Sequence, residues 1–305
     1  MRDPASEASA RGEPTPRLTG LDHVIIAVAD LAAATETYQR LLGRAPSWRG
    51  SHAAYGTANT LFRLSNTYVE LIGPVGAGAL ADSLRQHLAA QGEGPYGLAF
   101  ATAEADACVA ALRARGFDAA GPFDGSGRET SSGAVRRWRN SFLVPSQTRG
   151  VQMLIIEHRS PPDALPLAAP SGDASAAVDG LDHAVVMTAD AEGAIALYRD
   201  RLGLRLAFDK TFDARGVRLM FFRIAGITVE LAAPLAAGDA AAADRFWGLS
   251  YRVADIDAAR ARLAASGVDV SEVRDGNKAG TRVCSVRQPT HGVATLLIWH
   301  PPRTP

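Results

Sequence analysis

The chain has 305 residues, of which 47% are apolar and only four are Trp. That length and composition are typical of a globular protein with two ordinary domains. Lys plus Arg and Asp plus Glu both total 32, so no overall electrostatic field attracts the chain to nucleic acid or to an anionic membrane. We therefore expect a small-molecule partner, and a chain that is a monomer or a homodimer.

Two further features bear on location and redox chemistry. The N-terminus has no apolar segment behind its charges, and no later apolar run approaches the roughly 18 residues of a membrane span. This predicts a cytoplasmic protein that does not cross a membrane. Cys108 and Cys284 lack a second Cys at metal-motif spacing, so both are expected as free, buried thiols.

The N-terminal part of the chain predicts one β-α-β-β-β unit. Residues 1–18 mix Pro, Ser, Ala, Glu and Arg without periodicity, which predicts a disordered leader. A strand is expected over residues 21–28, and Asp30 then caps a helix that ends at Gly43. Three strands follow, one less regular near residues 47–54 and two at residues 57–64 and 67–72.

The rest of the chain predicts three more units. The second covers residues 97–156, with a helix at 105–115, strands near 119–123, 135–143 and 151–156, and a glycine-rich loop at 125–133. Residues 159–178, rich in Pro and Ala, predict a linker. The third unit, residues 181–234, repeats the first, and the fourth, which ends in a strand at 293–299, repeats the second. The expected domains are therefore residues 19–158 and 179–301.

The repeat includes residues that carry chemistry. Leu21-Asp22-His23 recurs as Leu181-Asp182-His183, and Val69-Glu70-Leu71 recurs as Val229-Glu230-Leu231. In both copies 47 positions separate the His from the Glu. A correspondence without gaps over this distance indicates duplication of a unit.

Four β-α-β-β-β units with these opening and closing strands resemble the vicinal oxygen chelate superfamily, which includes glyoxalase I, extradiol dioxygenases, methylmalonyl-CoA epimerase and bleomycin resistance proteins. Gly56-Thr57-Ala58-Asn59 and Arg137-Trp138-Arg139 are similar to a glyoxalase-like domain subgroup. The resemblance implies an α+β fold in which four βαβββ modules pair into two tandem cupped barrels. It also implies one divalent metal (Fe, Zn, Ni, Mn or Co) on a concave face, and no organic cofactor.

Strand geometry predicts which side chains face each cup. Alternation puts His23 and Ile25 on one face of their strand. A two-residue hairpin loop at residues 65–66 pairs Arg63 with Tyr68 and places Leu61 opposite Glu70. The same construction around residues 225–226 brings Arg223 and Phe221 beside the second Glu. Each cup is thus predicted to hold a His, a Glu and an Arg, and the predicted catalytic and metal-binding residues are His23, Glu70, His183 and Glu230.

The ligand set departs from the superfamily pattern. The second and fourth units offer Gly97, Leu154, Gly248 and Leu296 where further ligands would stand. Three accounts are open. A cup binds metal through its His and Glu with help from substrate or a neighbour; or both cups work without metal; or units one and three pair to make one complete site.

A basic and aromatic cluster follows at residues 136–140. In a strand, Arg137 and Arg139 face one way, and Arg136, Trp138 and Asn140 face the other, so one set looks into the first cup. The predicted substrate-binding residues are Arg63, Tyr68, Arg137, Trp138, Arg139, Phe221, Arg223 and Trp247. Asp22 and Asp182 are expected only to cap local backbone. His158 and His300 are expected at the surface or between domains, with the rim of a cup as the alternative. His52, His87 and His291 carry no signal.

These observations favour an enzyme of proton-transfer chemistry, an isomerase or lyase, that acts on an oxygenated or aromatic metabolite with possible metal assistance. A metal-free binding protein that sequesters a small molecule is the first alternative. An extradiol-type dioxygenase is the second, and it is less favoured because that chemistry needs a second His that neither cup supplies from its expected strand.

Overall fold

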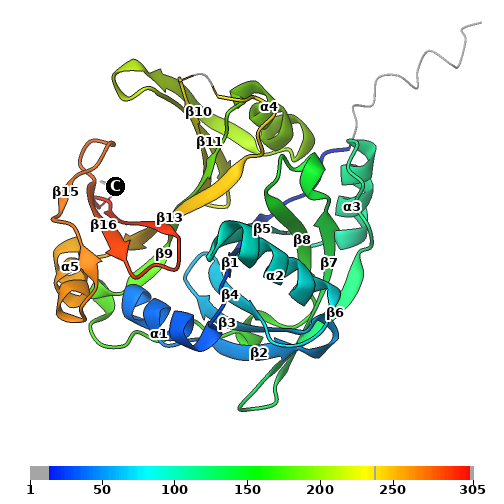
Figure 1. Cartoon of the computed structure of the whole chain (residues 1–305), viewed down its shortest axis with the longest axis horizontal. Helices are drawn as coiled ribbons and strands as arrows, with labels where there is room; N and C mark the ends of the chain where they lie inside the picture. Colours follow the sequence, from blue (N-terminus) through cyan, green and yellow to red (C-terminus); the bar gives the residue numbers. More distant parts are fainter. Residues whose placement is uncertain (1–13, 237, 303–305) are drawn as a thin grey trace, which may run out of the picture.

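The computed structural model describes residues 14–236 and 238–302. The first two modules close into an eight-stranded barrel with the strand order β1-β4-β3-β2-β6-β7-β8-β5 (Figure 1). Its elements are β1 (Gly20–Ala27), α1 (Leu31–Leu42), β2 (Trp48–His52), η3 (Ala53–Tyr55), β3 (Thr57–Arg63), β4 (Tyr68–Pro74), α2 (Ala79–Gln91), β5 (Gly94–Ala101), α3 (Ala105–Ala114), β6 (Phe123–Glu129), β7 (Val135–Leu143), η4 (Pro145–Gln147) and β8 (Gln152–His158).

The last two modules form a curved sheet that stays open, with the order β10-β11-β12-β9-β13-β17-β16-β14 and β15 paired to β16 (Figure 1). Two short helices, η5 (Pro162–Ala164) and η6 (Ala174–Ala176), lie in the connection from the barrel. The elements of the sheet half are β9 (Val178–Met187), α4 (Ala191–Ile195), η7 (Ala196–Arg201), β10 (Arg205–Phe212), η8 (Asp213–Arg215), β11 (Val217–Ile224), β12 (Ile227–Pro234), β13 (Arg245–Val253), α5 (Ile256–Ala265), β14 (Asp269–Val270), β15 (Arg274–Asp275), β16 (Arg282–Gln288) and β17 (Ala294–Trp299).

The predicted architecture of four modules in two tandem pairs is confirmed. β1 pairs β5 within the barrel, and β9 pairs β13 within the open sheet. The alternative in which units one and three pair is therefore wrong. The predicted ends of α1 are also confirmed. The Asp30 side chain accepts hydrogen bonds from two backbone N–H groups at the start of α1, and Gly43 ends that helix with φ 65°.

The hairpin registers agree with the sequence-based expectation. Arg63 pairs Tyr68 and Leu61 pairs Glu70 between β3 and β4. In the second half, Phe221 pairs Glu230 between β11 and β12. Short loops of fixed length determine this pairing, so the identity of the opposed residues could be predicted without coordinates.

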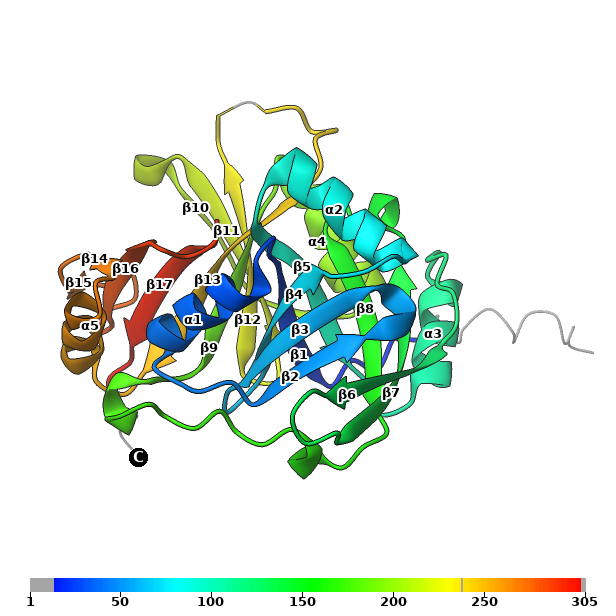
Figure 2. The same cartoon turned by 60° about the horizontal axis from the view of Figure 1, so that its bottom comes forward.

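Two parts of the barrel differ from prediction. α2 lies in a segment for which no element was predicted, between the first two modules, and it covers one end of the barrel (Figures 1 and 2). Leu80, Leu84 and Leu88 recur at helical spacing and pack against apolar side chains inside the barrel. The connection between β12 and β13 has no helix among its described residues, so the second cup lacks this cover.

Residues 125–129 of the predicted glycine-rich loop belong to strand β6, and only its remainder, residues 130–133, lies in the turn that leads to β7. The strand expected at residues 119–123 starts only at Phe123. Gly125 and Gly127 pair with Trp138 and Arg136 of β7. A Cβ built on Gly125 would collide with the Trp138 indole nitrogen. The glycines are therefore strand residues that leave room for large neighbours on the inner face.

One hydrophobic core joins the two halves. The largest cluster of buried apolar side chains includes Val24 and Tyr38 of the first half and Tyr198 and Tyr251 of the second. Arg262 donates to the Leu41 carbonyl oxygen at the end of α1 at 3.0 Å. Such contacts satisfy carbonyl groups that a helix end leaves free.

The segments outside the strands pack on the barrel. Residues 1–13 of the predicted disordered leader lie outside the described residues, whereas residues 14–18 run along α3, where Arg115 Nε donates to the Pro14 carbonyl at 3.0 Å. In the predicted linker, Leu165 is buried. Cys108 and Cys284 are free and buried, as predicted. In residues 14–236 and 238–302, no helix is long and apolar enough to cross a membrane.

The contact between β6 and Trp138 gives a first prediction. Gly125→Ala should lower the free energy of unfolding by about 1–3 kcal/mol, because the new methyl group must displace the indole of Trp138. Gly76→Ala is the control, since its Cβ would meet its nearest atom at an ordinary 3.6 Å. Urea unfolding followed by Trp fluorescence measures both. Equal unfolding midpoints for the two variants would contradict the close contact between Gly125 and the indole of Trp138.

Candidate functional site

The His and Glu of the first module meet inside the barrel. β1 and β4 run parallel, with His23 beside Tyr68 and Ile25 beside Glu70. Both side chains therefore point to the inner face from adjacent strands. His23 Nε2 lies 3.3 Å from Glu70 Oε2, and the two residues are only 3% and 8% exposed. The sequence repeat thus identified a buried pair of opposite charges.

Asp22 extends this pair into a chain of contacts. His23 Nδ1 donates to Asp22 Oδ1 at 2.7 Å, and His158 Nε2 lies 2.9 Å from Asp22 Oδ2. The expectation that Asp22 only caps backbone is therefore wrong. His158 is exposed and also lines the cavity described below, in agreement with the alternative that it reaches the rim of the cup. The pairing of β1 with β5 shifts register between Leu21 and His23, and this bulge interrupts the alternation on which the expectation rested.

The charges in this chain of contacts stabilise one another. Burial alone would lower the pKa of His23, but hydrogen bonds and the charges of Asp22 and Glu70 raise it to about 9. Burial would likewise raise the pKa of Asp22, but hydrogen bonds from His158 and His23 hold that pKa well below its usual range. His23 is therefore an imidazolium at neutral pH, and both carboxylates are ionised.

Glu70 is oriented by a second donor. Asn59 Nδ2 donates to Glu70 Oε1 at 2.7 Å, which leaves Oε2 for His23. Although burial favours the neutral acid, His23 and Asn59 together lower the pKa of Glu70. On the other side of the imidazole, Tyr68 stacks on His23 with the ring centroids 4.4 Å apart. The pair is therefore held by neighbours from β3 and β4.

The buried pair lies in the wall of a cavity of about 530 Å³ inside the closed barrel. Most of its other lining residues are aromatic or aliphatic, among them Leu80 of α2 and Trp138 of β7. Arg136 of β7 also lines it. Cavities of this size and apolar character, with few polar groups, are typical sites for small molecules. Tyr68 and Trp138, two of the predicted substrate-binding residues, lie in this wall.

Three predicted anchors lie elsewhere. The guanidinium of Arg63 donates to the carbonyl oxygens of Pro162 and Leu165 in the linker. Arg139 forms an ion pair with Asp106 on the outer surface, and Arg137 is exposed. The prediction that these arginines face the cup is wrong, since the strand phase turns Arg136, Trp138 and Asn140 inward instead. The linker, which covers the end of β3, explains the position of Arg63.

One member of the cavity wall was missed entirely. His52, at the end of β2, stacks edge-on against Trp138 with centroids 5.8 Å apart, and its Nδ1 lies 3.1 Å from Thr57 Oγ1. Burial lowers its pKa, so this imidazole is neutral at pH 7. Its place in a short strand that ends in a turn gave no pattern from which to predict it.

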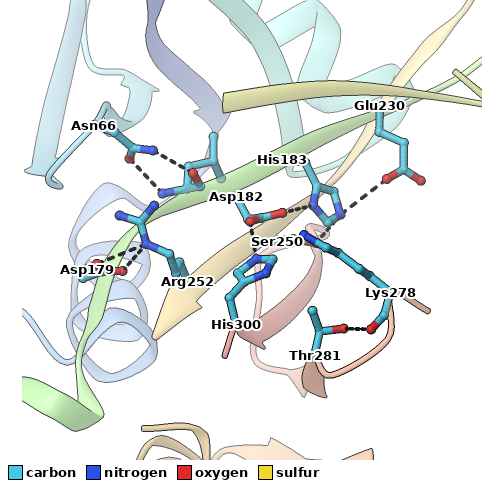
Figure 3. Close-up of polar contacts among 11 residues, drawn as sticks. Asn66, Asp179, Asp182, His183, Glu230, Ser250, Arg252, Lys278, Thr281 and His300 are labelled. Carbon is cyan, nitrogen blue, oxygen red and sulfur yellow. Dashed lines mark hydrogen bonds and ion pairs between the residues drawn. The ribbon is translucent and has the colours of Figure 1, made fainter. Parts of the chain in front are cut away.

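The second cup contains the same pair in looser form (Figure 3). His183 Nε2 lies 3.6 Å from Glu230 Oε2. The chain of contacts is repeated here, with His183 Nδ1 2.8 Å from Asp182 Oδ1 and His300 Nε2 2.6 Å from Asp182 Oδ2. Asp182 thus departs from prediction as Asp22 does, whereas the half-buried His300 lines the second cup, in agreement with the alternative of a rim position. Ser250 Oγ lies 2.7 Å from His183 Nε2, where the first cup has an Ala.

The two cups differ in size and charge. The second is a larger hollow of about 1340 Å³ in the open sheet, with Phe221, Arg223 and Trp247 in its wall as predicted. Leu219 stands where the first cup has Asn59, so the sequence already shows that the second carboxylate lacks an amide donor. Burial raises the pKa of Glu230, against the opposing charge of its His. An acid–base pair is therefore better ordered in the first cup.

The superfamily resemblance implies a divalent metal, which needs several ligands from side chains of the cup. Each cup brings one imidazole and one carboxylate together, through His23 with Glu70 and His183 with Glu230. Within residues 14–236 and 238–302, no three His, Cys, Asp or Glu side chains are grouped to hold a metal ion. Tight sites use three or four protein ligands. The residues do not fit such a shell, and no step below is routed through a metal.

Comparisons with known proteins agree with this architecture. Residues 21–177 match a family described as a glyoxalase-like domain, and residues 182–284 match the glyoxalase/bleomycin resistance protein/dioxygenase superfamily. A variant of 4-hydroxymandelate synthase from Streptomyces coelicolor superposes with a TM-score of 0.68 at 14% identity, over 92% of each chain. A hypothetical protein from Staphylococcus aureus gives 0.62 at 11% identity, over 92% of this chain and 99% of that one.

A third protein is similar over a shorter part of this chain, at a higher sequence identity. Methylmalonyl-CoA epimerase from Mycobacterium tuberculosis is 29% identical over 41% of this chain and 90% of its own, with a TM-score of 0.36. No curated protein matches the chain. The fold and the family matches together define a protein of tandem cupped modules. The chain belongs to the vicinal oxygen chelate superfamily, and its first half is a glyoxalase-like domain.

The charged chain of contacts predicts the effect of Asp22→Asn. At pH 7 the free energy of unfolding of this variant should be about 2 kcal/mol lower than that of the wild type, because a charged hydrogen bond to a buried imidazolium is lost. The His23 pKa is raised from 6.5 to about 9, so its contribution is complete below pH 6.5 and is lost as pH rises through 9.

Urea unfolding between pH 6 and pH 9.5 measures this contribution. The wild-type protein should lose stability over that range more steeply than Asp22→Asn. Asp106→Asn, at an exposed ion pair, is the control and should change little. Parallel stability curves for the wild type and Asp22→Asn would show that Asp22 does not raise the pKa of His23.

Proposed function

We propose that the N-terminal cavity is the active site of a proton-transfer enzyme, an isomerase or lyase, that acts on a small organic molecule with a carbonyl-type oxygen. Glu70 is the base and His23 the acid. The observation that carries the proposal is a buried carboxylate and a buried imidazolium side by side in the wall of a largely apolar cavity. Paired groups whose surroundings push their pKa values apart are typical of acid–base catalysis.

The geometry supports a division of labour. Glu70 Oε2 can accept a proton from the carbon next to the substrate's carbonyl group. His23 Nε2–H can donate to the oxygen on which negative charge develops. The 3.3 Å separation of the pair is longer than the 2.7 Å contact of His23 with Asp22, so the ion pair is the weaker of the two contacts.

Entry of a substrate would therefore break the contact between His23 and Glu70, while the hydrogen bond to Asp22 keeps the imidazole ring in place. A substrate oxygen that takes over the Nε2 proton leaves Glu70 with fewer stabilising contacts, which makes the carboxylate more basic. Return of the proton to the other face or to a neighbouring carbon completes an isomerisation. Departure of a leaving group from that neighbouring carbon completes a lyase reaction.

Two alternatives use the same fold differently. A protein that only sequesters a small molecule needs the cavity but has no need of the charged pair. An extradiol-type dioxygenase needs two His and one carboxylate around iron, and the described part of the first cup brings one such His to its Glu. The proton-transfer proposal is the one that uses every buried charge of the chain of contacts from Asp22 to Glu70.

Hydrogen–deuterium exchange tests the proposal without knowledge of the natural substrate. The wild-type protein in D₂O is offered small 2-oxo acids and aryl ketones with an exchangeable C–H, and exchange is followed by proton NMR. Glu70→Gln should slow catalysed exchange by roughly 10²–10⁴-fold, because the amide cannot accept the proton. Glu230→Gln, in the second cup, is the control and should exchange at the wild-type rate. Equal exchange by wild type and Glu70→Gln would reject Glu70 as the base.

A further inference from the structure

Arg136 is a buried cation in the wall of the N-terminal cavity. It lies on β7 and is 7% exposed. Its guanidinium carbon is 5.5 Å from the ring centroid of Trp48 and 5.8 Å from that of Tyr68. Among the described residues, no carboxylate or carbonyl oxygen accepts a hydrogen bond from its side chain, so the five N–H donors of the group face aromatic rings and the cavity.

Other inward-turned arginines of this chain are satisfied. Arg149 forms ion pairs with Asp244 at 3.0 Å and with Asp190 at 3.1 Å. Arg262 donates to carbonyl oxygens at the end of α1. A buried charge without a partner is costly, because burial removes its hydration without replacing it. The exception at Arg136 therefore indicates that its partner is a ligand.

We propose that Arg136 is an anion-binding residue that anchors the carboxylate of an aromatic or alicyclic acid in the N-terminal cavity. A guanidinium presents a planar fork that matches the two oxygens of a carboxylate. Trp48, Tyr68 and Trp138 offer flat faces for a ring attached to that carboxylate. One guanidinium balances one negative charge, and this favours a monoanion over a phosphate dianion.

This anchor lies close to the acid–base pair. The Tyr68 ring stacks on His23 at 4.4 Å and also contacts the guanidinium of Arg136. One aromatic ring thus separates the anion site from the imidazolium, and a small molecule held at Arg136 reaches Glu70 and His23. The inference rests on the proposed function only for the reaction, since binding at Arg136 requires no proton transfer.

Binding of simple probes tests the assignment. The probes are 4-hydroxyphenylacetate, its uncharged amide, and phenyl phosphate, and calorimetry or quenching of Trp fluorescence reports affinity. The wild-type protein should bind the carboxylate at least tenfold more tightly than the amide or the phosphate. Arg136→Met should weaken carboxylate binding by about 10- to 100-fold and leave amide binding unchanged. Arg137→Met, which removes the exposed neighbouring charge, should bind like the wild type.

Further measurements keep this test sharp. Arg136→Met without ligand should unfold at the same midpoint as Arg137→Met or a higher one, because an unpaired buried charge is removed. Glu70→Gln should retain carboxylate affinity, so loss of proton transfer alone leaves the anion site standing. Equal affinity of the wild-type protein for carboxylate and amide overturns the proposal. Tighter binding of phenyl phosphate than of the carboxylate also overturns it, as does unchanged carboxylate affinity in Arg136→Met.

Discussion

The fold of the N-terminal half positions an imidazole between two carboxylates away from solvent. His23 donates a hydrogen bond to Asp22 from one ring nitrogen and faces Glu70 with the other. Each of these charges would be costly to bury alone, and each is stabilised by the next. The parallel pairing of β1 with β4 brings the groups together, and the register shift beside Asp22 turns consecutive residues toward one another.

The same chain of contacts occurs twice, but its surroundings have diverged. In the first cup, Asn59 orients the carboxylate, Tyr68 stacks on the imidazole, and α2 covers the opening. In the second, Leu219 replaces the amide, and the surrounding sheet does not close into a barrel. The lowered pKa of the first Glu and the raised pKa of the second follow from these differences. Duplication therefore supplied two scaffolds, of which the first holds its acid–base pair in a closed barrel.

The two halves also depend on each other. Their apolar side chains form one cluster, and arginines of the second half contact helix ends of the first. His291 of the second half lies 2.6 Å from Glu93, in the loop that leads from α2 into β5. The second half therefore supports the barrel that holds the N-terminal cavity, whatever chemistry its own cup performs.

The sequence predicted those features that depend on short-range rules. Strand alternation placed His23 inside, and loop length fixed the pairing of Leu61 with Glu70. It could not predict features that depend on tertiary contacts. The phase of β7 decides that Arg136 rather than Arg137 faces the cavity, and the glycines of β6 read as a loop because the indole they accommodate comes from another strand. Leu80, Leu84 and Leu88 have the spacing of a helix, but α2 lies between the repeated units and so has no place in the repeat pattern.

The protonation state of His23 tests the central claim most directly. In protein labelled with ¹⁵N-histidine, the two ring nitrogens of His23 should both show the chemical shifts of protonated nitrogen at pH 7.5, because Asp22 and Glu70 hold the imidazolium. A His23→Gln sample assigns the signals. A neutral ring with a bare Nε2 at that pH would contradict the account, since the buried pair would then carry no positive charge and His23 could not serve as the acid.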